Sequence, residues 1–522
     1  MSPPISRSEN LRRNITAGFV VFLVALPLNL GIALASNAPL MSGMLAGLVG
    51  GVVVSLLSAS QLSITGPAAG LAAVVVATQN SLGSFDALLL ATVVAGCFQI
   101  LFGLSRAGFA ASLIPASVIH GMVFGIGLII VFQQVPHALG LKATLHFEES
   151  IFEIFSANYW HDAIAMAKSA WSSPNEASVV LFLSSLALML WWEKMARRSF
   201  VFFTVLPSAL AAVTLGSSLN YLFGLLGPDH ILGEDSGRLV DLPLFHGLDQ
   251  FFATIPSISM ESFAHSEIWK AGFMLAVVAS IQSLLSVEAS EKLDPQRRIP
   301  PANRELVAQG VGNIISGLLG GLPMTAVIVR TSTNIFAGAS SRLSGFSQGI
   351  LLVLAVTILP RVINLIPLAS LGAVLLMIGL RLCNPRMVRE AWQHGADQLI
   401  PFVATAVCVV TINLFWGVIV GTVIGLLIVL RLNFHSAFTL IQDGDDFFVR
   451  FAKDVTFVQK FVLRKMLADI PNHSRVFIDG GGAMFVDFDI RDVIEDFKRS
   501  AEERNISVSV RNIYAYKSPL LV

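Results

Sequence analysis

Apolar runs recur along most of this chain and constrain its fold more than any other feature. They form two sets of seven, near residues 15–35, 41–59, 67–79, 86–104, 116–134, 178–192 and 200–226, and near 267–290, 305–320, 324–338, 345–360, 367–382, 400–415 and 416–433. A helix that crosses a bilayer needs about 20 apolar residues. Only 13% of the 522 residues are charged, against about 25% in soluble domains. We therefore predict an α-helical polytopic membrane protein with 14 spans in two repeats of seven.

The third run of each set is too short to cross a bilayer. One extends from Pro67 to Gly83 and the other from Pro323 to Gly338, and glycine precedes the proline in both segments. Proline fits the first turn of a helix because its missing N–H would be unpaired there anyway. Two short, Gly/Pro-interrupted segments at corresponding places indicate a transporter site near the bilayer midplane. A re-entrant or kinked core helix without a ligand is the alternative interpretation.

The charged residues between runs predict the orientation, because cytoplasmic loops are enriched in Lys and Arg. Basic residues follow the even-numbered runs, at Arg106, Lys194, Arg197, Arg198, Lys292, Arg297, Arg298, Arg304, Arg342, Arg381, Arg386 and Arg389. Loops after the fifth and seventh runs are acidic, and Arg361 is an exception. We expect residues 1–13 to form a cytoplasmic tail and 14–435 the transport domain. Both termini are then cytoplasmic, and repeats of seven spans are inverted relative to each other.

The composition changes to that of a soluble domain from about Asp443. Strand patterns at 447–451, 475–479 and 506–511 alternate with amphipathic helix patterns at 458–470 and 490–504, which predicts a small α/β domain over 443–515. Asp479 is followed by three glycines that resemble a phosphate cradle. Because no Lys-Ser/Thr pair follows them, packing or interaction is the favoured interpretation.

The overall composition argues against several functions. The formal net charge is zero, which gives no reason to expect nucleic acid as a partner. The three cysteines lie in separate apolar runs, so they predict neither a metal cluster nor a disulfide framework. The apolar runs hold no His/Asp/Glu cluster and no nucleophile–base pair. An enzyme is therefore disfavoured, and no cofactor is expected.

The starts of the two short segments are candidate anion sites. Helix N-termini present free N–H groups and a positive dipole end. The predicted anion-binding groups are the backbone N–H groups of Ala68, Ala69, Gly70, Ala326, Val327 and Ile328. The hydroxyl of Thr325 either joins them or caps the helix. Arg330 is the cation of the second short segment, and it either attracts the anion or hydrogen-bonds to helix ends.

Several motifs resemble a known family. They are Asn303-Arg-Glu-Leu-Val-Ala-Gln-Gly-Val-Gly-Asn313, Gly321-Leu-Pro323, Arg330-Thr331, Ala25-Leu-Pro27 and Ile64-Thr-Gly-Pro67. Residues 10–435 resemble the SulP sulfate-permease family of inorganic-anion transporters, and 443–515 resemble its C-terminal STAS domain. The resemblance implies inverted repeats that form core and gate domains, an anion held between the broken helices, and a homodimer. It also implies an integral, multi-pass protein of a bacterial inner membrane.

The resemblance also implies roles for three polar residues. Asn29 lies one position after the place where the family often has Gln, so it either contacts the anion or hydrogen-bonds within the core. Gln282 occupies a position that is commonly a carboxylate in related transporters, and Ser286 lies one turn further on. These two are the candidate site for a coupling ion, Na⁺ or H⁺. Because an amide carries no charge and does not titrate near neutral pH, we expect weak coupling, exchange or uniport.

The favoured function is a secondary active transporter of small inorganic oxyanions that works by alternating access. The segment 284–295 resembles a subgroup often fused to carbonic anhydrase, which favours bicarbonate, with sulfate close behind. An anion channel, or an exchanger of chloride, sulfate or dicarboxylate, is the alternative with the same architecture. Saturable uptake and counterflow distinguish a carrier from a channel.

Overall fold

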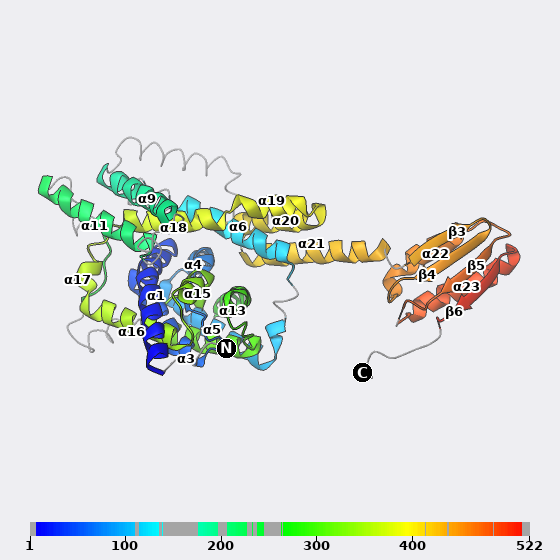
Figure 1. Ribbon diagram of the computed structural model, residues 1–522, viewed down its shortest axis with the longest axis horizontal. Helices are drawn as coiled ribbons and strands as arrows, with labels where there is room; N and C mark the ends of the chain where they lie inside the picture. Colours follow the sequence, from blue (N-terminus) through cyan, green and yellow to red (C-terminus); the bar gives the residue numbers. More distant parts are fainter. Residues whose placement is uncertain are drawn as a thin grey trace. The chain divides into compact units, whose positions relative to one another are not determined.

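The computed structural model describes residues 7–109, 114–134, 176–196, 206–226, 237–244, 265–412, 414–435, 438–483 and 485–513, with the single residues 138, 232 and 263. Most of this part is helical (Figure 1). The elements up to the middle of the chain are α1 (Arg7–Ala35), α2 (Leu40–Val49), the π-helical η1 (Gly50–Val54), α3 (Ser55–Leu57), β1 (Thr65–Pro67), α4 (Ala69–Leu82), α5 (Phe85–Leu104), α6 (Ala116–Gln133), α9 (Glu176–Ala196) and α11 (Ser208–Leu226).

The second set of elements repeats this order. It comprises α13 (Ser266–Leu293), α14 (Ala302–Leu318), β2 (Met324–Ala326), α15 (Ile328–Phe336), α16 (Leu343–Ile358), α17 (Pro360–Ile363), α18 (Leu368–Leu382), α19 (Pro385–Gln393), α20 (Ala396–Thr411) and α21 (Leu414–His435). In each set a short strand followed by a short helix takes the third place, where the sequence predicts the broken segment.

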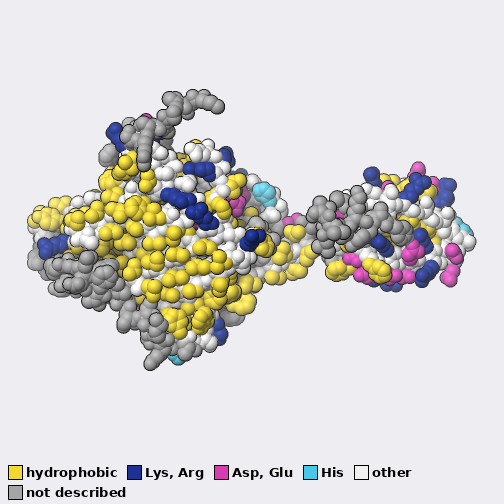
Figure 2. Space-filling model, turned by 90° about the horizontal axis from the view of Figure 1, so that it is seen from below, with side chains coloured by type: hydrophobic (Ala, Val, Ile, Leu, Met, Phe, Trp, Pro, Cys, Tyr) yellow, Lys and Arg dark blue, Asp and Glu magenta, His cyan; other side chains and the backbone are white. Residues whose placement is uncertain are grey.

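The helical part is a polytopic membrane fold. Within the described residues, eight helices are long and apolar enough to cross a membrane. Shorter apolar helices are α4, α16, α20 and the part of α21 from Leu414 to Leu430. Figure 2 shows hydrophobic side chains covering most of one face of this part, with Lys and Arg gathered in a few places. Large apolar side chains such as Leu101, Leu354 and Ile358 are exposed there, as expected for surfaces that lipid covers.

The two short strands pair with each other across the chain. β1 and β2 run antiparallel, with Thr65 opposite Ala326, Gly66 opposite Thr325 and Pro67 opposite Met324. All six residues are buried. α4 begins two residues after β1 ends, and α15 begins two residues after β2 ends. We call this pair of strands the central ribbon.

The helices α5 and α14 pack along each other, and α14 contacts β2 of the central ribbon. They pack with their backbones in close approach, because a Cβ on Gly96 would come within 2.5 Å of the carbonyl oxygen of Gly310. A Cβ on Gly310 would likewise lie 2.6 Å from the carbonyl oxygen of Gly96. Buried apolar side chains of α4, α5 and α13 form one core cluster beside them. The ribbon therefore rests on a tightly packed scaffold.

The C-terminal part is a separate compact unit, from Val423 onward. Its four strands lie in the order β3 (Phe438–Asp443), β4 (Asp446–Phe451), β5 (Arg475–Asp479) and β6 (Ser507–Arg511). β3 and β4 are antiparallel, whereas β4, β5 and β6 are parallel. The 3-10 turn η6 (Phe457–Gln459) precedes α22 (Lys460–Ala468), and α23 (Phe488–Glu503) follows β5. This is an α/β fold with its own hydrophobic core.

Some sequence-based boundaries differ from the structure. α1 begins at Arg7, so residues 7–13 of the predicted cytoplasmic tail are helical. The sheet begins at Phe438, ahead of the domain start predicted at 443. Strand β3 was missed because the pattern Thr439-Leu-Ile-Gln442 has no clear alternation. The run predicted at 200–226 contains α11 from Ser208, and residues 200–205 lie outside the described part of the chain.

Candidate functional site

The central ribbon brings two helix N-termini to one place. Ala68 caps α4 with φ −113° and ψ 131°, and Val327 caps α15 with φ −121° and ψ 113°. Both caps are extended residues that continue their strands, and neither side chain can accept a hydrogen bond. The first backbone N–H groups of a helix have no partner within that helix. The ribbon therefore places two sets of unpaired donors next to each other.

Some of the predicted donors are free and others are not. Three N–H groups in the first turns of the two helices have no acceptor within the described part of the chain, namely those of Ala69, Gly70 and Ile328. The N–H of Ala68 is not free, because the pairing of Pro67 with Met324 continues the ladder so that this N–H faces the carbonyl of Pro323. The N–H of Val327 instead donates to the carbonyl of Ile64 at 2.9 Å. That of Ala326 donates to Ser283 Oγ at 3.3 Å. In this conformation both N–H groups already have acceptors, whereas the sequence predicts that they are free donors.

Arg330 lies in the first turn of α15 and is fully buried. Its Nη2 donates to the carbonyl of Pro67 at 3.3 Å. Nε and Nη1 have no hydrogen-bond partner within the described residues. A Cβ on Gly66 would clash with Nη1, so glycine at that position makes room for the guanidinium beside β1. The cation thus reaches from one broken helix to the start of the other, with two donor nitrogens unused.

Gln282 of α13 lies against the first turn of α4. Its Nε2 is 2.7 Å from the position that a Cβ on Gly70 would occupy, and that nitrogen has no hydrogen-bond partner within the described residues. The side chain is half-buried, as is Ser286 one turn further along. Between them, Ser283 is fully buried and bonds to the ribbon. The structure thus brings Gln282 to the N-terminus of α4, whereas no contact among the described residues joins Ser286 to it.

Two predicted residues face other surroundings. Thr325 is fully buried, and its hydroxyl donates to the carbonyl of Ala326 at 3.1 Å, not into open space. Asn29 is fully buried in α1, and neither atom of its amide has a partner within the described residues. A Cβ on Gly47 of α2 would clash with that amide. Asn29 therefore packs against α2, and its contact with an anion stays a prediction.

Sequence reasoning missed a row of buried polar residues on α14. We call Glu305, Gln309, Asn313 and Ser316 the α14 polar stripe. All four side chains are fully buried. They recur at spacings of four, four and three, which places them on one face of a helix. This spacing within an apolar run was the signal available in the sequence, but it does not say which backbone groups the side chains reach.

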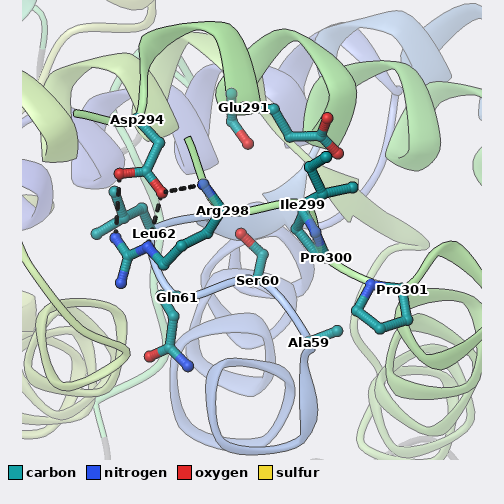
Figure 3. A pocket seen from close by; sticks show the side chains of 11 residues that line it. Ala59, Ser60, Gln61, Leu62, Glu291, Asp294, Arg298, Ile299, Pro300 and Pro301 are labelled. Carbon is teal, nitrogen blue, oxygen red and sulfur yellow. Dashed lines mark hydrogen bonds and ion pairs between the residues drawn. The ribbon is translucent and has the colours of Figure 1, made fainter. Parts of the chain in front are cut away.

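A separate cavity of about 210 Å³ lies at the C-terminal end of α13 (Figure 3). It is lined by residues 59–62, by Glu291 and by the connection to α14, where Asp294 and Arg298 form an ion pair at 2.7 Å. Ser290 also lines this cavity. It lies eight residues after Gln282, or roughly 12 Å along the helix. The cavity is therefore distinct from the N-termini at the ribbon.

The arrangement at the ribbon suits an anion. It combines two helix N-termini, one buried guanidinium with unused donors, and the neutral amide of Gln282. The described residues contain no group of three or more His, Cys, Asp or Glu side chains that could hold a metal ion. Free N–H groups and a positive charge stabilise negative charge where water is excluded.

Known proteins resemble this chain over most of its length. The sequence profile described as the Sulfate permease family matches residues 11–405. The chain is 26% identical to the "Putative sulfate transporter YvdB" of Bacillus subtilis, over 81% of this chain and 74% of that protein. It is also 26% identical to the "Bicarbonate transporter BicA" of Synechocystis, over 84% and 73% of the two chains.

Two solved structures share the fold. One is the transmembrane domain of a cyanobacterial bicarbonate transporter BicA, with a TM-score of 0.64 and 22% identity, covering 80% of this chain and 98% of that one. The other is the murine anion transporter Slc26a9 in its inward-facing state, with a TM-score of 0.79 and 16% identity, covering 98% and 87%.

Proposed function

Because this chain belongs to the sulfate permease family, we propose that it is a secondary active transporter of small inorganic oxyanions that works by alternating access. Bicarbonate is the favoured substrate, and sulfate is close behind. The observation that carries the proposal is the pair of helix N-termini on the central ribbon, with Arg330 of one helix reaching the start of the other. The protein is expected in a bacterial inner membrane, as a homodimer with both termini in the cytoplasm.

The proposed site offsets the main energetic cost of carrying an anion through a membrane, which is the loss of its water shell. An anion that loses its water shell needs hydrogen-bond donors and positive charge in exchange. The free N–H groups of Ala69, Gly70 and Ile328 offer the donors. Backbone donors and dipole ends carry no full fixed charge, so the anion can also leave. In this proposal Val327 and Ala326 shape the site and Thr325 holds its backbone.

Charge alone does not choose between the two substrates. Each helix N-terminus acts as about half a positive charge, so two of them with Arg330 amount to about two positive charges. This suits either a singly or a doubly charged oxyanion. The preference for bicarbonate rests on the segment 284–295 and on the similarity to proteins named as bicarbonate transporters.

The coupling ion follows from Gln282, which lies at the site but carries no charge. Moving one charge across the membrane potential changes the energy by about 2.3 kcal/mol per 100 mV. An amide in place of a carboxylate at position 282 neither carries a charge nor titrates near neutral pH, so this position offers no evident means to drive anion uptake against that potential. We therefore propose weak coupling, exchange or uniport, with Ser286 contributing polarity only.

The test is uptake of labelled bicarbonate and labelled sulfate into proteoliposomes, with and without imposed Na⁺ and pH gradients. Ala69→Phe fills the space beside the free N–H groups of α4 and should abolish saturable uptake. Ala77→Phe is the matched control, because Ala77 lies on the same helix and is exposed. Normal saturable uptake by a well-folded Ala69→Phe protein would overturn the placement of the site. Conductance without saturation would indicate a channel instead.

A further inference from the structure

The α14 polar stripe holds both strands of the central ribbon. Asn313 accepts the N–H of Met324 on Oδ1 at 2.7 Å, and its Nδ2 donates to the carbonyl of Met324 at 3.1 Å. Gln309 Nε2 donates to Thr65 Oγ1 at 2.8 Å. Ser316 Oγ donates to the carbonyl of Leu322 at 2.8 Å, just before β2. One helix therefore binds residues from β1, from β2 and from the entry to β2.

The ribbon needs such support. Each strand has three residues, and an isolated two-stranded hairpin is marginally stable at best. The N–H of Met324 and the N–H of Ala326 both receive side-chain acceptors, from Asn313 and Ser283. Side chains thus occupy the outer edge of β2, where a third strand would otherwise pair. The register of the two helix N-termini depends on these contacts.

Other side chains in turn hold the amides of Gln309 and Asn313. Gln309 Nε2 also donates to Glu305 Oε1 at 2.9 Å, and the other oxygen of Glu305 accepts from Ser58 Oγ at 2.5 Å. Asn313 Nδ2 donates to Gln99 Oε1 on α5 at 2.7 Å. Turning Asn313 would break three hydrogen bonds and turning Gln309 would break two, so both amides are held although Gln309 Oε1 has no partner within the described residues. The α14 polar stripe therefore holds the central ribbon in position.

We propose that Asn313 and Gln309 are positioning residues that set the spacing of the two broken-helix N-termini and thereby the affinity for the transported anion. Neither residue touches the anion in this proposal. Asn313 acts through Met324 on α15, and Gln309 acts through Thr65 on α4. The inference rests on the proposed anion site between these helices.

A matched pair of substitutions tests the role of Asn313. Asn220 on α11 binds a backbone in the same way. Its Oδ1 accepts a hydrogen bond from the N–H of Leu232 at 3.0 Å, and its Nδ2 donates to the carbonyl of Leu232 at 3.2 Å. Both side chains are buried. Asn313→Ala should raise the Kd for bicarbonate or sulfate about tenfold in the purified full-length protein, and Asn220→Ala should leave it within about twofold. Equal effects of the two substitutions would reduce Asn313 to a structural residue and overturn the proposal.

A double-mutant cycle tests Gln309 independently, and it decides the matter if Asn313→Ala does not fold. Thr65→Val removes the hydroxyl at nearly constant shape. If Gln309 acts through Thr65, Gln309→Leu and Thr65→Val should each raise the Kd several-fold, and the double substitution should do no more than either alone. Additive effects would overturn this half of the proposal.

Hydrogen exchange supplies a local readout that loss of overall stability does not mimic. Backbone amides in 64–70 and 322–328 should exchange faster in Asn313→Ala, while those of α16 and α18 keep their wild-type rates. A uniform increase across the membrane part would contradict a positioning role. If Ala69→Phe leaves binding intact, the proposed site itself fails. If Ala69→Phe abolishes binding while Asn313→Ala and Gln309→Leu leave Kd unchanged, only the present inference fails.

Discussion

Arg330 brings a positive charge into the protein interior without an ion-pair partner among the described side chains. Its one hydrogen bond within the described residues is to the carbonyl of Pro67, so most of its hydrogen-bonding capacity is free for another acceptor. Burying an unpaired charge is costly. An anion between the two N-termini would relieve that cost, and this makes the residue a sensitive probe of the site.

Arg330→Ala should weaken anion binding. Two unit charges about 8 Å apart at an effective dielectric constant near 20 interact by roughly 2 kcal/mol, and about 1.4 kcal/mol is a tenfold change in Kd. We expect a Kd for bicarbonate or sulfate that rises about tenfold or more. Arg330→Lys should keep part of the affinity, because it keeps the charge. An unchanged affinity in a stable Arg330→Ala protein would rule out the electrostatic role.

Gln282→Glu should introduce or strengthen a dependence of uptake on Na⁺ or on pH. The carboxylate would stand beside the first turn of α4, where it could bind a cation through its oxygens or carry a proton. The measurement is uptake after a Na⁺ step and after a pH step in both proteins. Strong cation-driven accumulation by the unaltered protein would contradict the weak-coupling proposal. It would direct attention to Glu288, a carboxylate of α13 six residues after Gln282.

At the scale of single elements, periodicity and composition account for what the sequence predicts. Long apolar runs locate helices such as α5 and α13 within a few residues. The Gly/Pro breaks locate the two short segments, but Pro67 lies in β1 and not in the first turn of α4, and α15 begins five residues after Pro323. The pairing of β1 with β2 has no local signal, because three-residue strands show no alternation. The occupied N–H of Val327 depends on Ile64, a residue from the other half of the chain. Such long-range contacts are set by packing and are absent from any local pattern.

The loop after β5 illustrates a motif that the structure explains differently. The N–H of Gly481 donates to Asp479 Oδ1 at 2.9 Å, and the N–H of Gly480 donates to the carbonyl of Arg511. These two donors are therefore used within the domain, which agrees with the packing interpretation of the glycines. The hydrogen bond from Asn512, together with that from Gly481, lowers the pKa of Asp479 below its usual range.

Asp479→Asn should destabilise the α/β unit at neutral pH. A carboxyl whose folded-state pKa is lowered contributes stability above its unfolded pKa of about 4, and loses that contribution as the pH falls through the folded value. The difference between the two proteins should therefore shrink below about pH 4. Hydrogen exchange of β5 and β6, compared at equal pH, measures it, with the exposed Asp445→Asn as control. A difference that persists at pH 2 would contradict this linkage.

At the scale of the whole molecule, every residue of the proposed anion site lies in the first compact unit, which ends at Thr422. The family profile matches only within it, over residues 11–405. A protein truncated after His435 should therefore retain saturable uptake of bicarbonate or sulfate in proteoliposomes. Size-exclusion chromatography checks that the truncated protein is folded. Loss of uptake by a monodisperse truncated protein would show that the α/β unit is needed for transport itself.

The antiparallel pairing of β1 with β2 has a consequence for how such a chain arose. Each half of the sequence supplies one strand of three residues, and the two strands point in opposite directions. A half-length ancestor with a single copy of this strand could build the same ribbon only by associating with a second copy of itself. If the two halves are inverted repeats, as the sequence predicts, that second copy would have to enter the membrane from the other side. Fusion of the two copies into one chain removes the need for a precursor that inserts equally well in both directions.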